Sequence, residues 1–174
     1  MMPKQTIFKL LLTSAVLSFA NSALASFADD LAATLVKRSG EEFEAASTDV
    51  LEGKKYIAVY YSAHWCPPCR LFTPKLSKFY DEVVQAHPEF ELIFVSSDRD
   101  AAAMAEYMNW AEMNFFAVDF AKTRSTPLRK HAARGIPYLI LLDADGNVLI
   151  EKPADEQWAH PEDILPQISK LLEG

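Results

Sequence analysis

Two cysteines separated by two prolines constrain the fold of this chain more than any other feature of its sequence. The segment Trp65-Cys66-Pro67-Pro68-Cys69-Arg70 lies between a run of β-branched and aromatic residues, 57–61, and a stretch with helical apolar spacing, 67–86. The cysteine pair is therefore expected where a buried strand ends and a long amphipathic helix begins. A helix N-terminus presents unpaired backbone N–H groups and a partial positive charge, which stabilise a thiolate at that position.

The two prolines affect both the shape and the hydrogen bonding of this turn. They stiffen it and hold the two sulfurs at bonding distance. Pro67 and Pro68 also lack N–H groups, so the nearest backbone donors left for the Cys66 sulfur are the amides of Cys69 and Arg70. We therefore expect the pKa of the Cys66 thiol to lie below that of a free cysteine.

Other uses of the cysteine pair compete with redox chemistry. A structural disulfide between residues three apart closes a very short loop, so it would stabilise the fold little. Zinc needs four ligands, and His64 and His131 are the candidates to complete a set. A Cu(I) ion could use the two thiolates alone. The spacing and the position of the pair favour redox chemistry, and no metal site is predicted.

The rest of the chain alternates between strand and helix patterns. Buried strands are predicted at 57–61, 90–95 and 138–142, the last followed by a hairpin through Asp145-Gly146-Asn147 to 148–150. Helices are predicted at 27–38, 67–86, 101–110, 126–133 and about 164–172. This alternation indicates an α/β fold, a central mixed sheet with helices on both faces. No repeat or linker divides residues 26–174, so we expect one domain there.

Residues 1–25 have the pattern of a secretory signal peptide. Lys4 and Lys9 are its only charged residues, an apolar stretch follows, and the segment ends in Ala23-Leu24-Ala25. The apolar run is too short for a permanent membrane anchor, which needs about 20 residues. We expect cleavage after Ala25, a periplasmic or secreted protein without stable membrane insertion, and an oxidising environment for its thiols.

The formal net charge of −7 excludes one class of function. Affinity for the phosphate backbone needs a basic surface, and the sequence has no run of lysine and arginine, so nucleic acid is not an expected partner. The same charge disfavours strongly acidic partners.

The cysteine turn and its surroundings resemble the thioredoxin superfamily. The shared features are the strand, the Trp65-Cys66-x-x-Cys69 turn, Pro74 in the following helix and Gly135-Ile136-Pro137 before a strand. More specifically, Trp65-Cys66-Pro67-Pro68-Cys69-Arg70, Phe72-Thr73-Pro74-x-Leu76-x-x-Phe79-Tyr80 and Asp143-Ala144-Asp145-Gly146 are similar to tryparedoxins and nucleoredoxins. Exported bacterial thioredoxin-like proteins are a looser match. The resemblance covers about residues 40–150 and implies a thioredoxin fold.

The resemblance also implies roles for individual residues. Cys66 would be the attacking thiolate and Cys69 the resolving thiol, while Trp65 would shield one side of the pair. Pro137 would form a cis peptide bond with Ile136 facing the sulfurs, which leaves the Ile136 backbone free to pair with an extended substrate segment.

The function implied is that of a thiol:disulfide oxidoreductase, which acts on protein thiols and disulfides and needs no bound cofactor beyond its own redox-active disulfide. Similarity to tryparedoxins favours a reductant of exported proteins, supplied with electrons by a donor such as a membrane dithiol protein. Two alternatives remain: a Cu(I)-handling protein, and a noncatalytic binding module regulated by the redox state of the same cysteines.

One position departs from thioredoxins proper. Six residues before the first cysteine they keep a buried acid, thought to assist proton transfer at the second thiol, and here Tyr60 stands in its place, as an aromatic does in tryparedoxin-like chains. Asp98 is a candidate proton acceptor, although an N-cap role is favoured for it. His64 and Arg70 flank the thiols and are expected to be solvated. Trp110 is expected in the core or at its edge.

Overall fold

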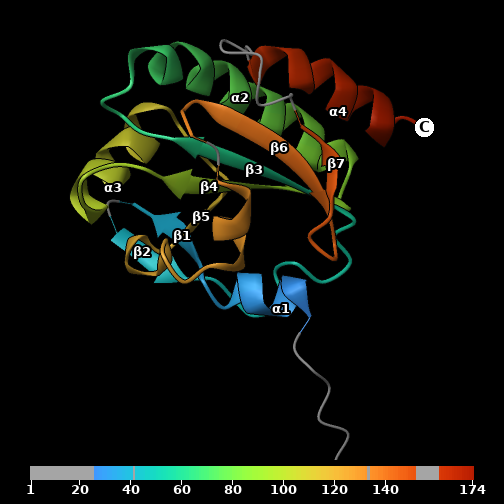
Figure 1. The fold of residues 1–174 in the computed structure, drawn as a ribbon, viewed down its shortest axis with the longest axis horizontal. Helices are drawn as coiled ribbons and strands as arrows, with labels where there is room; N and C mark the ends of the chain where they lie inside the picture. Colours follow the sequence, from blue (N-terminus) through green and yellow to red (C-terminus); the bar gives the residue numbers. More distant parts are fainter. Residues whose placement is uncertain (1–25, 41, 133, 152–160) are drawn as a thin grey trace, which may run out of the picture.

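A seven-stranded mixed sheet forms the centre of the structure, a computed structural model that describes residues 26–40, 42–132, 134–151 and 161–174. Its strands are β1 (Leu35–Ser39), β2 (Glu42–Ala45), β3 (Tyr56–Ser62), β4 (Phe90–Ser96), β5 (Phe116–Val118), β6 (Tyr138–Asp143) and β7 (Val148–Ile150). They lie in the order β2-β1-β5-β4-β3-β6-β7 (Figure 1). The predicted signal peptide, 1–25, lies outside the described residues.

Helices connect these strands. The α-helices are α1 (Phe27–Ala32), α2 (Pro67–Ala86), α3 (Ala101–Trp110) and α4 (Leu165–Leu172). Short 3-10 helices are η1 (Phe120–Lys122), η2 (Pro127–His131) and η3 (Pro161–Ile164). Among the described residues, none of these helices is both long and apolar enough to cross a membrane.

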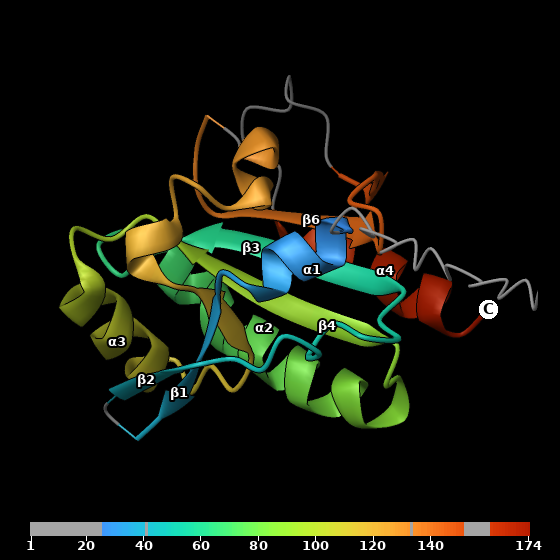
Figure 2. The same ribbon diagram turned by 90° about the horizontal axis from the view of Figure 1, so that it is seen from below.

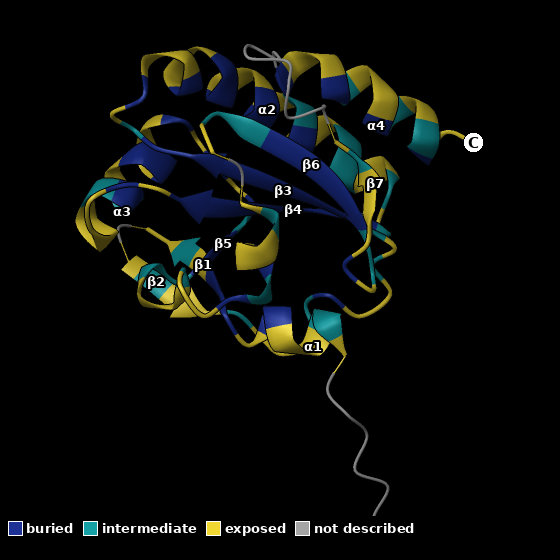
Figure 3. Ribbon diagram, viewed as in Figure 1, coloured by how far each residue is buried: buried dark blue, intermediate teal, exposed yellow. Residues whose placement is uncertain are grey.

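The central strand β3 determines where the cysteines lie. It runs parallel to β4 and antiparallel to β6, with Ser62 opposite Ser96, so the ends of β3 and β4 lie side by side. Because side chains alternate along a strand, Ala58 and Tyr60 contribute to the core on one face of the sheet, and Val59 to the core on the other. Figure 3 shows that the central strands are buried.

Each face of the sheet is covered by helices. Side chains of α2, α3 and α4, such as Phe72, Tyr107 and Ile168, pack on one face, and Leu31 of α1 and Leu128 of η2 pack on the other. Figure 1 shows α2 and α4 on one side of the sheet and α1 on the opposite side. The predicted α/β architecture with helices on both faces is confirmed.

The predicted helix over 27–38 is wrong beyond Ala32. Residues 35–39 form β1, which pairs antiparallel with β2 and β5. Burial of Leu35 and Val36 in the sheet outweighs the helix-forming composition of the segment. The hairpin of β1 and β2 lies beside α3 (Figure 2), where Arg38 donates a 2.7 Å hydrogen bond to Asn109.

The remaining predicted elements are found with small changes. α2 and α3 have the predicted bounds, and α2 continues through Pro74 to its end. The hairpin from β6 to β7 turns at Gly146, whose φ of 80° favours glycine. The helix predicted at 126–133 is shorter, a 3-10 helix at Pro127–His131.

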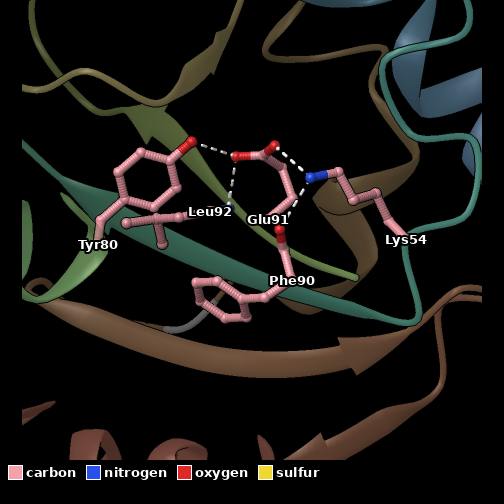
Figure 4. Close-up of polar contacts among 5 residues, drawn as sticks. All are labelled: Lys54, Tyr80, Phe90, Glu91 and Leu92. Atoms are coloured by element: carbon pink, nitrogen blue, oxygen red, sulfur yellow. Dashed lines mark hydrogen bonds and ion pairs between the residues drawn. The ribbon is translucent and has the colours of Figure 1, made fainter. Parts of the chain in front are cut away.

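A charged residue is buried in β4. Glu91 is 3% exposed, and its carboxylate lies 3.1 Å from the Lys54 ammonium (Figure 4). The carboxylate also accepts hydrogen bonds from the Tyr80 hydroxyl at 2.8 Å and the Leu92 amide at 3.0 Å. Lys54 donates to the Phe90 carbonyl at 3.0 Å. The buried charge is therefore compensated by one cation and two donors.

Removing one partner of this pair is expected to destabilise the fold. Lys54→Met leaves the Glu91 carboxylate buried without its cation, and should lower the free energy of unfolding by about 3 kcal/mol. Glu91→Gln should cost less, because glutamine still accepts from Tyr80 and the partly exposed Lys54 can reach water. In urea titrations at pH 7, the double variant Lys54→Met/Glu91→Gln should be more stable than Lys54→Met alone. Additive losses in the double variant would contradict this coupling.

Candidate active site

The two cysteines meet at the junction of β3 and α2. Cys66 occupies the N-cap position of α2 with an extended backbone, and Cys69 lies in the first helical turn. The two residues are joined by a disulfide. Cys66 is 4% exposed, whereas Cys69 is fully buried. Cys66 is therefore the member of the pair that a group from outside can approach.

The start of α2 supplies one backbone donor to the Cys66 sulfur. The Cys69 amide nitrogen lies 3.3 Å from Cys66 Sγ, as expected. The Arg70 amide, the second expected donor, instead donates to the Cys66 carbonyl at 3.1 Å. Pro67 and Pro68 occupy the first two helical positions. One amide and the helix dipole together thus provide the positive potential at this sulfur.

The Ile136–Pro137 peptide bond is cis, as the resemblance implied. It faces the disulfide, because the carbonyl oxygen of Ile136 lies 3.7 Å from Cys66 Sγ. Both residues directly precede β6 and are partly exposed. The backbone of Ile136 is therefore next to the more accessible cysteine.

Trp65 connects the cysteine turn to the loop that follows β4. Its side chain is among the exposed large apolar groups, at 58%, and its indole N–H donates to the Ser97 carbonyl at 3.1 Å. The Ser97 amide in turn donates to the carbonyl of Ser62 at 2.8 Å. These bonds hold the two loops together at the end of the parallel strands.

A buried carboxylate, that of Asp98, joins the same loops. Its two oxygens accept hydrogen bonds from the His64 amide at 2.8 Å and the Ser96 hydroxyl at 2.9 Å. The interpretation of Asp98 as an N-cap is wrong, because Asp100 caps α3 and accepts from the Ala103 amide. Its other suggested role, as proton acceptor for the second thiol, stays a prediction.

The residues that flank the thiols differ in exposure. His64 is not the solvated residue expected, because its ring stacks on Tyr107 at 5.1 Å and lies 5.5 Å from Trp110. Arg70 is exposed, as expected, and donates to the His64 carbonyl at 3.2 Å. Trp110 is half-exposed, which confirms its place at the edge of the core.

Buried hydroxyl groups that the sequence did not predict lie behind Cys69. Thr73 donates to the Cys69 carbonyl at 2.8 Å, so its oxygen accepts from its other neighbours. These are Tyr60, at 2.7 Å, and Tyr107, which forms a shorter hydrogen bond to Thr73. Tyr107 is also bonded to Ser62 at 3.0 Å.

This hydroxyl network is uncharged. Burial raises the pKa of both Tyr60 and Tyr107 above the ordinary tyrosine value, so both retain their protons at neutral pH. Tyr60, at the position of the buried acid of thioredoxins, thus places a neutral donor behind Cys69. Thr73 lies four residues after Cys69 and shares its helix face, a spacing that could have indicated the contact. Tyr107 comes from α3, and no local pattern indicated it.

The described residues do not form a set of ligands for zinc. Within the described ranges, no three histidine, cysteine or acidic side chains gather as metal ligands would. His64 stacks on an aromatic ring, and burial lowers the pKa of His131. A Cu(I) site would require only the cysteine pair.

Comparison with known proteins identifies relatives of this chain. A family model described as thioredoxin-like matches residues 53–148. Probable nucleoredoxin 1 of Arabidopsis thaliana is 42% identical over 119 residues, which cover 68% of this chain but 20% of the nucleoredoxin. The chain thus spans about a fifth of that relative. Tryparedoxin of Trypanosoma brucei brucei is 35% identical over 122 residues, covering 68% of this chain and 78% of the tryparedoxin.

A solved structure agrees with these relatives. The crystal structure of thioredoxin from Wuchereria bancrofti is 34% identical, with a TM-score of 0.61, and the match covers 81% of this chain and 97% of that one. The predicted thioredoxin fold and the similarity to tryparedoxins and nucleoredoxins are therefore confirmed. This chain belongs to the thioredoxin-like family.

Proposed function

We propose that this protein is a thiol:disulfide oxidoreductase that reduces disulfides of exported proteins. The observation that carries the proposal is the Cys66–Cys69 disulfide at the start of α2, with Cys66 slightly exposed, at 4%, and Cys69 fully buried. This asymmetry suits an exchange in which one sulfur meets the partner and the other completes the reaction. The tryparedoxin and nucleoredoxin relatives support it.

The exchange conserves atoms and electrons at every step. The Cys66 thiolate of the reduced protein attacks a sulfur of the partner's disulfide, and the partner's other sulfur leaves as a thiolate. Cys69 then loses its proton and attacks Cys66, which breaks the mixed disulfide and releases the second partner thiolate. Two electrons pass to the partner, and the protein is left oxidised, with Cys66 and Cys69 joined in a disulfide.

Neighbouring residues would position the partner during this exchange. Pro67 and Pro68 hold the turn rigid, and Trp65 shields one side of the sulfurs. The backbone of Ile136, next to cis-Pro137 and 3.7 Å from Cys66 Sγ at its carbonyl oxygen, would pair with an extended segment of the partner.

The reducing direction requires an external electron donor. No bound cofactor takes part, because the electrons reside in the cysteine pair. After each turnover a dithiol must reduce the disulfide again, and in an oxidising compartment a membrane dithiol protein would supply it. Reduction of partners is favoured over oxidation by the relatives named tryparedoxin.

Export of the domain rests on residues 1–25, which we propose to be a signal peptide of a bacterial type, removed to leave 26–174 in the periplasm or outside the cell. Ser26 caps α1, and its backbone nitrogen lies 3.0 Å from the Asp29 carboxylate. After cleavage this nitrogen would be a charged amine with a carboxylate partner.

Replacing the second cysteine should trap the reaction midway. The reduced Cys69→Ser variant is expected to form a covalent adduct with insulin, a disulfide-containing probe, because the mixed disulfide at Cys66 can no longer be resolved. The adduct should appear on non-reducing gels and disappear when a reductant is added. Wild-type protein should reduce insulin without accumulating the adduct.

The Cys66→Ser variant is the matched control and should form little adduct, because Cys69 is buried. Equal adduct formation by both variants would contradict the assigned order of attack. Stoichiometric Cu(I) binding by wild-type protein that does not reduce insulin would favour the copper-handling alternative. Binding of a partner that both cysteine replacements leave intact, without any adduct, would favour the binding module.

Expression of the full chain in a bacterial host should release a mature protein whose N-terminus is Ser26. Intact mass measurement of the periplasmic fraction checks this. Replacing Ala23 and Ala25 with larger residues should block cleavage, because the processing enzyme requires small residues there. A full-length chain that stays in the cytoplasm would contradict the proposed export.

A further inference from the structure

Basic residues gather in one segment that leads to the active site. Residues 120–142 contain no acidic residue and have a net charge of +5, from Lys122, Arg124, Arg129, Lys130 and Arg134. The segment runs from η1 into β6 and includes cis-Pro137 beside the disulfide. The other residues together carry −12, because the whole chain has a net charge of −7. The net negative charge of the chain is therefore not spread evenly along its sequence.

Two arginines line a groove at the border of this segment. The groove has a volume of about 500 Å³ and lies between the loop after β4, which contributes Arg99, and the stretch around η1, which contributes Phe120 and Arg124. Within the described parts of the chain, neither guanidinium donates a hydrogen bond or forms an ion pair. Asp98, the acid in the lining, is buried, and both its oxygens already accept hydrogen bonds.

The groove shares a wall with the cysteine turn. Asp98, in its lining, accepts the His64 amide, and the adjacent Ser97 accepts the indole N–H of Trp65. His64 and Trp65 directly precede Cys66. A ligand in this groove would therefore lie next to the residues that bring the accessible cysteine to the surface.

The arginine side chains that line the groove favour an anionic ligand. A guanidinium binds a carboxylate through two parallel hydrogen bonds, and an exposed group without an internal partner keeps all its donors for a ligand. Arginines that served only to stabilise the fold would be expected to pair within it. Clustered charges of one sign also speed the approach of an oppositely charged partner.

We propose that this groove binds an acidic segment of the partner protein, with carboxylates near the partner's disulfide held by Arg99 and Arg124. The inference rests on the proposed function and adds the substrate class to it. A polypeptide segment fits better than a small anion, because the proposed reaction already brings a protein disulfide to Cys66. The partner's carboxylates would orient its disulfide toward Cys66.

The test uses three disulfide-bonded peptides that share the residues around the disulfide and differ in their flanks, which are glutamates, glutamines or lysines. The reduced full protein is expected to reduce the glutamate peptide about tenfold faster than the glutamine peptide at low ionic strength. High salt should shrink this ratio, because exposed charges are screened. The lysine peptide should be the slowest.

In Arg99→Glu/Arg124→Glu, the ratio of the glutamate to the glutamine rate should fall to one or below. The matched control is Lys55→Glu/Lys170→Glu, which changes the net charge equally at exposed positions before β3 and in α4, and should keep the wild-type ratio. Circular dichroism and thermal unfolding verify that each variant folds. The ratio within each variant is the measured quantity, so a general loss of activity does not affect it.

Equal rates for the glutamate and glutamine peptides would overturn this inference and leave the proposed function standing. Failure of wild-type protein to reduce any peptide would instead overturn the proposed function, and the inference with it. Oxidised glutathione, a small anionic disulfide, is a further probe. If replacing Arg99 and Arg124 slowed its reduction as much as that of the glutamate peptide, binding of an extended segment would be overturned. A control variant that lost the preference as fully as the arginine variant would exclude the groove.

Discussion

The hydrogen bond from the Cys69 amide to the Cys66 sulfur is the interaction on which the rest of this site depends. It exists because the buried strand β3 delivers the chain to the first turn of α2 with Cys66 as the N-cap. Two prolines remove other donors at this end, so a single amide and the helix dipole carry the electrostatic effect. The same geometry buries Cys69 fully in the first helical turn and leaves Cys66 slightly exposed, so position alone gives the two sulfurs different access to a partner.

Polar groups around the disulfide are arranged in two zones. Behind Cys69, the hydroxyls of Thr73, Tyr60 and Tyr107 form a buried, uncharged network that satisfies its own hydrogen bonds. In front, charged groups border the surface, and the Arg99 and Arg124 side chains lack internal partners in the described residues. Neutral support behind the cysteines and a charged approach in front would let partner recognition vary without disturbing the cysteine geometry.

The sequence predicted elements whose signals were local and strong. The apolar spacing of α2 led to its correct bounds, and the glycine turn led to the hairpin of β6 and β7. The segment of β1 was predicted to be helical because its strand conformation depends on pairing with β5, about 80 residues away in the chain. Asp98 was the favoured N-cap, but Asp100, the same residue type two positions later, caps α3. The stacking of His64 on Tyr107 depends on tertiary packing and left no sequence signal.

The start of α2 makes Cys66 reactive, and the pKa of its thiol measures this effect. The rate of alkylation by iodoacetamide, followed against pH in a Cys69→Ala variant, reports this pKa, because the backbone amide of residue 69 is retained. We expect a midpoint at about pH 7 or below in the folded protein, and one at about 8.5 after unfolding in urea. A midpoint of about 8.5 in the folded protein would contradict it, because the helix terminus would then not stabilise the thiolate.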